Sequence, residues 1–306
     1  MPIKDFDLLA QLEPVVAENL NRHLSVAKEW MPYEYVPWHL GRDFADEPWQ
    51  PADSGLDRVT QISFEVNLLT EDNLPSYHRE IDTAFGRDGA WAAWTGQWTA
   101  EEGRHSLVMR DYLLVTRGVD PVQLERDRME QMKTGYHAPE GNGVLDVMAY
   151  VSFQELATRI AHRNTGLATK DPIADRLMKR VAADENLHMI FYRNLVSAAL
   201  EIDASRTVSA IANAVIGFEM PGTGIRDFQR RALEIAKAGI YDLRVHHDEV
   251  VQPLLRHWDL FGITGLDDTA EQSRESVAAY LAGLDALAST FTAKRDERRT
   301  REKVPA

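Results

Sequence analysis

The sequence predicts an all-α protein, a four-helix bundle core with additional packed helices. Apolar residues recur at steps of three and four through most of the 306 residues, and no alternating strand pattern extends beyond a few residues. One ligand pattern also occurs twice. Glu71 is followed roughly thirty residues later by Glu102-Gly-Arg-His105, and Glu155 roughly thirty residues later by Glu185-Asn-Leu-His188. A lone Glu with a later Glu-x-x-His, given twice, is the ligand set of a di-iron or di-manganese four-helix bundle.

The helices can be placed in order from the apolar spacing and its interruptions. The first is expected at 7–29, where leucines and valines from Leu8 to Leu24 are spaced near 3.6 residues. Residues 31–56 are rich in proline, tryptophan and glycine and should form an irregular connection. The other helices are expected at 57–84, 88–116, 121–134, 144–166, 171–200, 205–218, 225–238, 245–257 and 269–297. Clusters of glycine and proline separate several of them, at 118–121, 135–143 and 220–224.

We assign residues 1–306 to a single ferritin-like domain. Residues 57–200 should form its metal-binding four-helix core, and residues 201–297 should form the additional helices. The mostly charged segment 298–306 should be a disordered tail, because chain ends without an apolar face are poorly held.

Composition excludes several classes of function. The net charge is −14 and the pI is near 5.2, which argues against a nucleic-acid-binding protein because such proteins need a basic face. Without cysteine the chain has no disulfide, thiolate metal site, iron–sulfur cluster or cysteine nucleophile, so electrons must come from outside. The first residues lack the apolar stretch of a signal peptide, and no apolar run reaches the roughly 18 residues of a membrane span. A cytoplasmic protein without a transmembrane segment is therefore expected.

The repeated carboxylates lie on the apolar stripes of their helices. Glu102 and His105 share a face with Trp98 and Met109, at steps of three and four, and the stripes of the other three glutamates are similar. Four unpaired carboxylates buried in one core would cost several kcal/mol each and would repel one another. Two divalent cations would balance their charge, and oxygen ligands with one imidazole per ion suit iron or manganese.

The spacing of these residues alone leaves explanations other than a metal site open. About one Glu-x-x-His is expected by chance in a chain with this much Glu and His. Glu102 could be a surface charge, and Glu71 could pair with an arginine. The matched offsets in the two halves favour the metal site.

Polar residues near the repeats also receive predictions. The acidic residues that precede two ligands, Glu101 and Asp184, should support the ligands by hydrogen bonds rather than bind the metal. His162 and His78 should be hydrogen-bonded core or boundary histidines. The run His246-His-Asp-Glu249 is predicted to be a solvated helix turn rather than a second metal site.

Four motifs surround the predicted ligands. They are Thr70-Glu71-Asp-Asn-Leu-Pro-Ser-Tyr77, Trp98-Thr-Ala-Glu-Glu102-Gly-Arg-His105, Ser152-Phe-Gln-Glu155-Leu-Ala-Thr158 and Ala183-Asp-Glu185-Asn-Leu-His188. Together they resemble the soluble acyl-acyl-carrier-protein (acyl-ACP) desaturases over about residues 8–257. The likeness is closer to the actinobacterial, mycobacterial-type branch than to the plant plastid enzymes.

The resemblance implies a role for each matched residue. Two iron ions, with manganese as a substitute, would be bound by Glu71, Glu102, His105, Glu155, Glu185 and His188. Glu102 and Glu185 match the carboxylates that bridge the irons. Thr158 matches a hydroxyl implicated in oxygen activation, although a mid-helix threonine often only bonds the carbonyl one turn back. Trp30 and Asp184, with His105, match an electron route from the surface to the metal, although simple core packing also explains Trp30.

The resemblance also implies a reaction and its partners. A ferredoxin-type donor would supply two electrons, and dioxygen would be activated at the di-iron centre. A fatty acyl chain on acyl carrier protein would lose hydrogens from adjacent methylenes, leaving a cis double bond and water. Family members form homodimers, so a homodimer is expected. The positions that match tunnel-lining sites are Thr83, Ala84, Val147 and Met148.

Substrate details are left open by one departure from the plant enzymes. The segment from Gly217 to Arg231 is shorter here and lacks a charged pair that influences the position of the double bond. Carrier protein and ferredoxin are both acidic, as is this chain, so docking needs a local basic face. The candidate face, which could equally be a solvated charged surface, consists of Arg226, Arg230, Arg231 and Lys237.

Other functions compete with desaturation. A di-iron hydroxylase or N-oxygenase would use the same ligands. A non-enzymatic, ferritin-like metal-storage protein would be a shorter bundle, so the helices after residue 200 argue against it. A scaffold that binds no metal is the last alternative.

Overall fold

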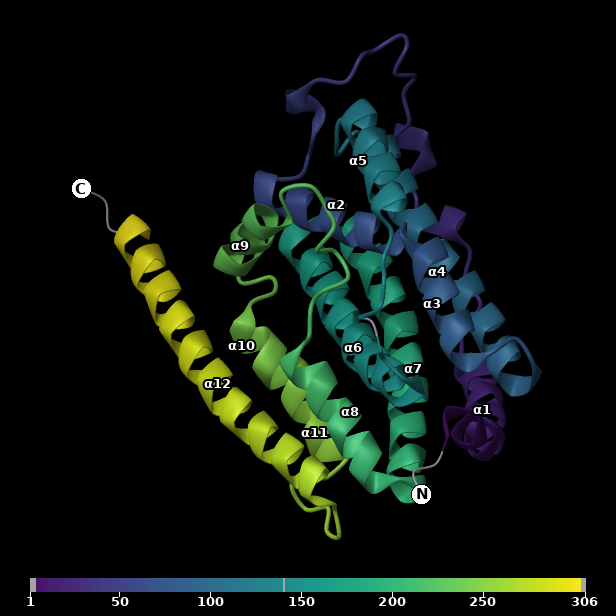
Figure 1. Cartoon of the computed structure of the whole chain (residues 1–306). Helices are drawn as coiled ribbons and strands as arrows, with labels where there is room; N and C mark the ends of the chain where they lie inside the picture. Colours follow the sequence, from purple (N-terminus) through teal and green to yellow (C-terminus); the bar gives the residue numbers. More distant parts are fainter. Residues whose placement is uncertain (1–3, 140, 304–306) are drawn as a thin grey trace.

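The four apolar stripes that carry the predicted ligands lie on the helices of one bundle. The computed structural model describes residues 4–139 and 141–303, and among these residues helices dominate and no strand occurs, as predicted. The bundle consists of α2 (Arg58–Glu71), α4 (Gly89–Val115), α6 (Val144–Thr169) and α7 (Pro172–Ile202). Figure 1 shows α6 and α7 side by side at the centre of the molecule. None of the described helices is both long enough and apolar enough to cross a membrane.

The same Asp-Pro pair begins two of the helices. The Asp171 carboxylate accepts a hydrogen bond from the Ile173 N–H at 2.8 Å at the start of α7, and Asp120 caps α5 (Pro121–Thr134) in the same way. Asp satisfies a free N–H of the first turn, and proline is tolerated there because its missing N–H would have no partner. Both helix starts were placed correctly from the sequence.

The single helix expected at 57–84 is two helices. After α2 ends at Glu71, α3 spans Leu74–Phe85. Pro75 has no N–H to donate to the carbonyl of Glu71, so an unbroken α-helix cannot pass this point. The break leaves Glu71 in the last turn of α2, with its side chain buried in the bundle.

The remaining helices cover the bundle from two sides. The first, α1 (Asp5–Val26), packs against α4 and α7, whereas α8 (Ala204–Ile216) packs against α6 and α7. In Figure 1 the last helix, α12 (Asp268–Lys303), runs along the outer side of α8. Two further helical segments are α9 (Phe228–Ala238) and the stretch from α10 to α11.

The prediction of a disordered tail at 298–306 is wrong for residues 298–303. Helix α12 continues to Lys303, and residues 304–306 lie outside the described part of the chain. Charges of opposite sign one turn apart support an exposed helix. Glu297 and Arg301 form such a pair, with 3.9 Å between the carboxylate and the guanidinium.

A wide turn interrupts the helix expected at 245–257. Between α10 (Leu243–Val245) and α11 (Gln252–His257), residues 246–251 form a π-helical turn in which the Gln252 N–H bonds to the His247 carbonyl, five residues back. Pro253 follows and has no N–H for the carbonyl of Glu249, which accounts for the irregular turn.

This turn directs His246 into the protein, so the predicted solvated turn is wrong for this residue. His246 is 8% exposed, and its ring stacks on Phe218 with 4.7 Å between centroids. The Tyr241 hydroxyl lies 2.9 Å from His246 Nδ1. Burial, with a smaller contribution from His247, lowers the pKa of His246 to about 4.

We therefore expect His246 to make the protein sensitive to acid. The unfolded chain takes up a proton at this histidine below about pH 6.5, but the folded protein does so only near pH 4, so stability falls as the pH falls between these values. At pH 5 the loss is about 2 kcal/mol relative to pH 7.5. Urea unfolding of wild type and His246→Gln at both pH values measures it. An equal acid loss in the variant would contradict the assignment.

Candidate functional site

The sequence-predicted ligands meet in one buried cluster. Helices α2, α4, α6 and α7 each turn an apolar stripe inward, as predicted. None of the six residues is more than 6% exposed: Glu71, Glu102, His105, Glu155, Glu185 and His188. The interpretation of Glu102 as a surface charge is therefore wrong.

His105 lies at the centre of a first group. Its Nδ1 atom is 3.1 Å from Glu185 Oε1, 3.3 Å from Glu102 Oε2 and 3.5 Å from Glu71 Oε2. One ligand atom from each of these four residues lies within 4.8 Å of all the others. Three carboxylates and one imidazole thus face a common point.

His188 lies at the centre of a second group that shares members with the first. Its Nδ1 atom is 2.8 Å from Glu102 Oε1 and 3.5 Å from Glu155 Oε2. Glu102 directs one oxygen toward each histidine, and both Glu102 and Glu185 belong to both groups. Two groups with two shared carboxylates have the arrangement needed to hold two adjacent cations.

Unpaired buried atoms in the cluster fit this interpretation. The Nδ1 atoms of His105 and His188, Glu155 Oε2 and Glu185 Oε1 have no hydrogen-bond partner among the described residues. Buried polar atoms are normally satisfied, because leaving one without a partner is costly. All four are metal-ligand atoms of the kind that iron and manganese accept, so the residues fit two such ions.

Without a cation the cluster must hold protons instead. Burial, and next the charge of Glu185, raise the pKa of Glu102 to about 7 and raise the pKa of Glu155 well above its usual range. Burial alone would lower the pKa of His188, but its contacts with Glu101 and Glu102 raise that pKa well above the ordinary value. The core therefore resists ionising all its carboxylates unless positive charge accompanies them.

Asp184 and Trp30 lie together behind His105. The Trp30 indole N–H donates to Asp184 Oδ2 at 2.7 Å, and the same oxygen is 3.5 Å from His105 Nε2. Trp30 is only 4% exposed and lies under the Arg104 guanidinium, 5.0 Å from the ring centroid. The three predicted residues thus form a continuous line of contacts from just below the surface to the cluster.

Glu101 occupies the corresponding place behind His188, but its partner differs. Glu101 Oε2 is 2.9 Å from His188 Nε2 and 3.0 Å from His23 Nε2. His23 is fully buried and comes from α1. Sequence reasoning missed it, although Leu12, Val16 and His23 continue one stripe of α1 and would have placed it in the core.

Thr158, His162 and Trp98 bond directly to ligand carboxylates. The Thr158 hydroxyl lies 2.6 Å from Glu185 Oε2 and 3.1 Å from the Gln154 carbonyl one turn back, so the expected backbone contact occurs together with a contact to a predicted ligand. His162 Nε2 is 2.8 Å from Glu71 Oε1, and the Trp98 indole N–H donates to Glu155 Oε1 at 3.0 Å. His162 is the buried, hydrogen-bonded histidine that was expected, but its partner is a predicted ligand.

Comparison with known proteins agrees with this architecture. A family model described as fatty acid desaturase matches residues 4–305. The chain belongs to the fatty acid desaturase family. It is therefore an enzyme of the oxidoreductase class, because desaturation removes hydrogen from its substrate.

Individual relatives of the desaturase cover nearly the whole chain. DesA1 of Mycobacterium tuberculosis, assigned by name to the acyl-ACP desaturases, is 44% identical over 99% of this chain and 94% of its own length. A chloroplastic stearoyl-ACP 9-desaturase of Oryza sativa subsp. indica is 28% identical over 96% of this chain and 80% of its own. The X-ray structure of DesA2 from M. tuberculosis H37Rv superposes with a TM-score of 0.70 at 29% identity, covering 87% of this chain and 98% of that one.

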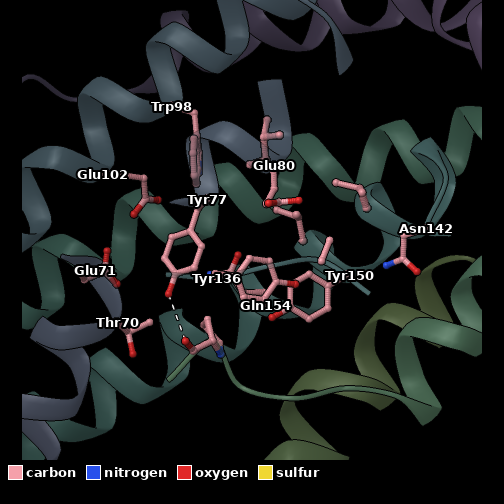
Figure 2. Close-up of a pocket in the computed structure, with 15 residues that line it drawn as sticks. Thr70, Glu71, Tyr77, Glu80, Trp98, Glu102, Tyr136, Asn142, Tyr150 and Gln154 are labelled. Carbon is pink, nitrogen blue, oxygen red and sulfur yellow. Dashed lines mark hydrogen bonds between the residues drawn. The ribbon is translucent and has the colours of Figure 1, made fainter. Parts of the chain in front are cut away.

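A cavity in the desaturase reaches the ligand cluster. Figure 2 shows Glu71 and Glu102 at one end and Asn142 at the other, with tyrosine rings between them. The cavity is narrow, with a volume of about 50 Å³. Apolar and aromatic side chains supply most of the wall: Tyr77, Ile81, Trp98, Tyr136, Val147, Tyr150 and Val151.

Only one of the four predicted tunnel positions lines this cavity. Val147 is part of its wall, whereas Met148 is fully buried in the hydrophobic core. Ala84 packs against that core, and Thr83 faces solvent. The residues of α3 that face the cavity are Tyr77 and Ile81, so the two α3 positions taken from the family resemblance do not line its wall.

The prediction of an exposed basic docking face is wrong for Arg231. Its side chain is 11% exposed and contacts Glu65 and Asp127, each at 3.1 Å. Arg226 also pairs with Asp127, at 3.0 Å, and Arg230 pairs with Asp227. Arg226 and Arg231 thus link the segment around α9 to α2 and α5, whereas Arg230 pairs within its own segment.

Proposed function

We propose that the protein is an acyl-ACP desaturase. It would introduce a cis double bond into a fatty acyl chain held by acyl carrier protein, using dioxygen at a di-iron centre and electrons from a ferredoxin-type donor. The observation that carries the proposal is the pair of ligand groups that share Glu102 and Glu185 at the end of an aromatic-walled cavity. The names of the mycobacterial and plant relatives support the substrate class.

The six ligand residues would hold two iron ions, or manganese in their place. When bound, iron supplies an oxidant strong enough for unactivated C–H bonds, which no side chain provides. Glu101 holds the ring of His188 by a contact at Nε2, and Asp184 Oδ2 lies 3.5 Å from the same atom of His105, so that Nδ1 of each ring faces the cluster. Thr158 holds one oxygen of Glu185 and keeps this shared carboxylate in place.

The proposed reaction balances as a four-electron reduction of dioxygen. Two adjacent methylenes of the acyl chain each lose one hydrogen, and the two carbons form a second bond, which releases two electrons and two protons. The donor supplies two further electrons, and two more protons come from solvent. One dioxygen thereby becomes two waters.

The other residues of the site position substrate and electrons. The cavity wall would hold the chain with two methylenes beside Glu71 and Glu102. We propose Trp30, Asp184 and His105 as the route by which electrons enter, since they are in contact and end near the surface under Arg104. The homodimer and the cytoplasmic location stay predictions.

Product analysis tests the proposal. Iron-loaded protein with ferredoxin, its reductase and acyl-ACP should bind about two irons per chain and yield monounsaturated fatty acid by gas chromatography. A hydroxylated product would instead favour a di-iron hydroxylase. A full metal complement with no oxidised product, and a large shell on size-exclusion chromatography, would favour metal storage. Well under one iron per chain would contradict the metal site.

A further inference from the structure

A buried imidazole from outside the bundle lies beside the ligand cluster. His23 belongs to α1 and is fully buried, and its ring lies nearly parallel to that of His188 with 5.8 Å between centroids. His23 Nδ1 has no hydrogen-bond partner among the described residues. Burying an imidazole with one nitrogen unsatisfied is costly, so an apolar side chain would serve packing alone better. The polar contact of the other nitrogen is therefore the feature that calls for an explanation.

That contact is with the carboxylate behind His188. Glu101 Oε2 lies 3.0 Å from His23 Nε2 and 2.9 Å from His188 Nε2, so one oxygen meets both imidazoles. The second oxygen, Oε1, accepts a hydrogen bond from the Gln97 side chain at 2.8 Å. An ionised carboxylate accepts hydrogen bonds and donates none, so both histidines carry a proton on Nε2. Nδ1 of His188 is thereby the nitrogen that is left for a metal ion.

Asp184, the acidic residue behind His105, is held by different side chains. Its carboxylate accepts from the Trp30 indole and pairs with Arg180, which lies one turn earlier in α7. Within the described part of the chain, no hydrogen bond or ring contact joins His23 to Asp184 or His105. Loss of the His23 imidazole should thus affect only one of the two ligand groups.

We propose that His23 is a positioning residue for the metal ion of the second ligand group, the one centred on His188. Through Glu101 it fixes the orientation of the His188 ring, so that Nδ1 is already directed at the group when the ion arrives. The inference rests on the proposed function, because it assumes that the cluster binds two ions. Helix α1 would therefore take part in metal binding although it lies outside the bundle.

Metal titration of variants that keep one complete ligand group tests this role. Glu71 belongs only to the first group, so Glu71→Gln leaves the second group with all its ligands. Glu155 belongs only to the second group, so Glu155→Gln leaves the first group complete. Mn²⁺ is titrated by calorimetry, without oxygen, into the metal-free full-length chain. Adding His23→Leu to Glu71→Gln should weaken Mn²⁺ binding by about tenfold or more. Adding it to Glu155→Gln should change the affinity by less than about twofold.

Two further substitutions of His23 separate its polar contact from its packing. His23→Gln is the matched control, because its amide can still donate to Glu101 from nearly the position of Nε2. In the Glu71→Gln background it should keep the Mn²⁺ affinity within about threefold. His23→Asn has an amide that ends too near the backbone to reach Glu101. It should behave like the leucine variant, and it supplies the test if that variant does not fold.

Two results would overturn the inference. One is an unchanged Mn²⁺ affinity when His23→Leu or His23→Asn is added to Glu71→Gln. The other is an equal loss of affinity in the Glu71→Gln and Glu155→Gln backgrounds, which would show a general effect on the fold. Wild type that binds no Mn²⁺ would overturn both this inference and the metal site.

Product formation by the iron-loaded protein judges the proposed function separately. A His23 effect confined to the second ligand group, without any unsaturated product, would support the positioning role and contradict desaturation. Unsaturated product together with an unchanged Mn²⁺ affinity in the His23 variants would overturn the positioning role alone.

Discussion

Replacing Glu102 by glutamine should abolish the metal centre with little damage to the fold. Glu102 faces both histidines, so both metal positions lose a charged ligand while the shape of the side chain is kept. Bound iron should fall from two ions per chain to one or fewer. Desaturation should fall by on the order of 10³-fold, because several kcal/mol of metal-derived stabilisation is lost. Metal analysis after ferrous loading and chromatography of the fatty acids measure both effects.

Glu80→Gln is the matched control for this variant. Glu80 is a carboxylate in the wall of the same cavity but belongs to neither ligand group. Its glutamine variant should bind the wild-type amount of iron. The metal-free Glu102→Gln protein should melt no lower than metal-free wild type, since one of four mutually repelling carboxylates is gone. Two irons and a near-wild-type rate in Glu102→Gln would refute the shared-ligand assignment.

Loading with metal should stabilise the protein strongly. Each ion, at a concentration about a thousand times its dissociation constant, contributes about 4 kcal/mol of stability. For a chain of this size two ions should raise the melting temperature by roughly 10–20 °C. The physical cause is that the cations remove repulsion among Glu71, Glu102, Glu155 and Glu185 and fill the contacts of ligand atoms that otherwise have no partner.

Calorimetry without oxygen, with ferrous or manganous ion, measures this shift. A chelator should reverse it. In Glu102→Gln the shift should shrink by at least half, whereas Glu80→Gln should retain it. A melting temperature that does not respond to either ion in wild type would show that the cluster is a protonated core rather than a metal centre.

The ligand cluster could be predicted because helices impose a strict geometry on sequence. Glu102 and His105 fall on one face through their spacing alone, and the apolar neighbours determine that this face is buried. The same rule would have located His23. The rule gave a wrong result between Glu71 and Leu74. The apolar pattern predicted one continuous helix there, but Pro75 prevents it.

Features that depend on loops or on contacts between distant helices could not be predicted from helical spacing. The cavity wall depends on how Tyr136 and Pro221 come together from two segments that have no periodic pattern. The pairing of Arg231 with Asp127 and Glu65 depends on tertiary contacts between distant helices. At Arg231 the charge in the sequence therefore suggested an exposed docking residue where the fold pairs the charge internally.

The contacts behind the two histidines carry a last consequence. The repeat gives each half of the bundle a similar acidic residue behind its histidine, but Asp184 meets the indole of Trp30, whereas Glu101 meets the imidazole of His23. Two ions of the same element would therefore occupy chemically different binding sites in this centre. Although the ligand pattern repeats in the sequence, the two histidines differ in their surroundings. Only His105 has a tryptophan near the surface, Trp30, behind its acidic neighbour.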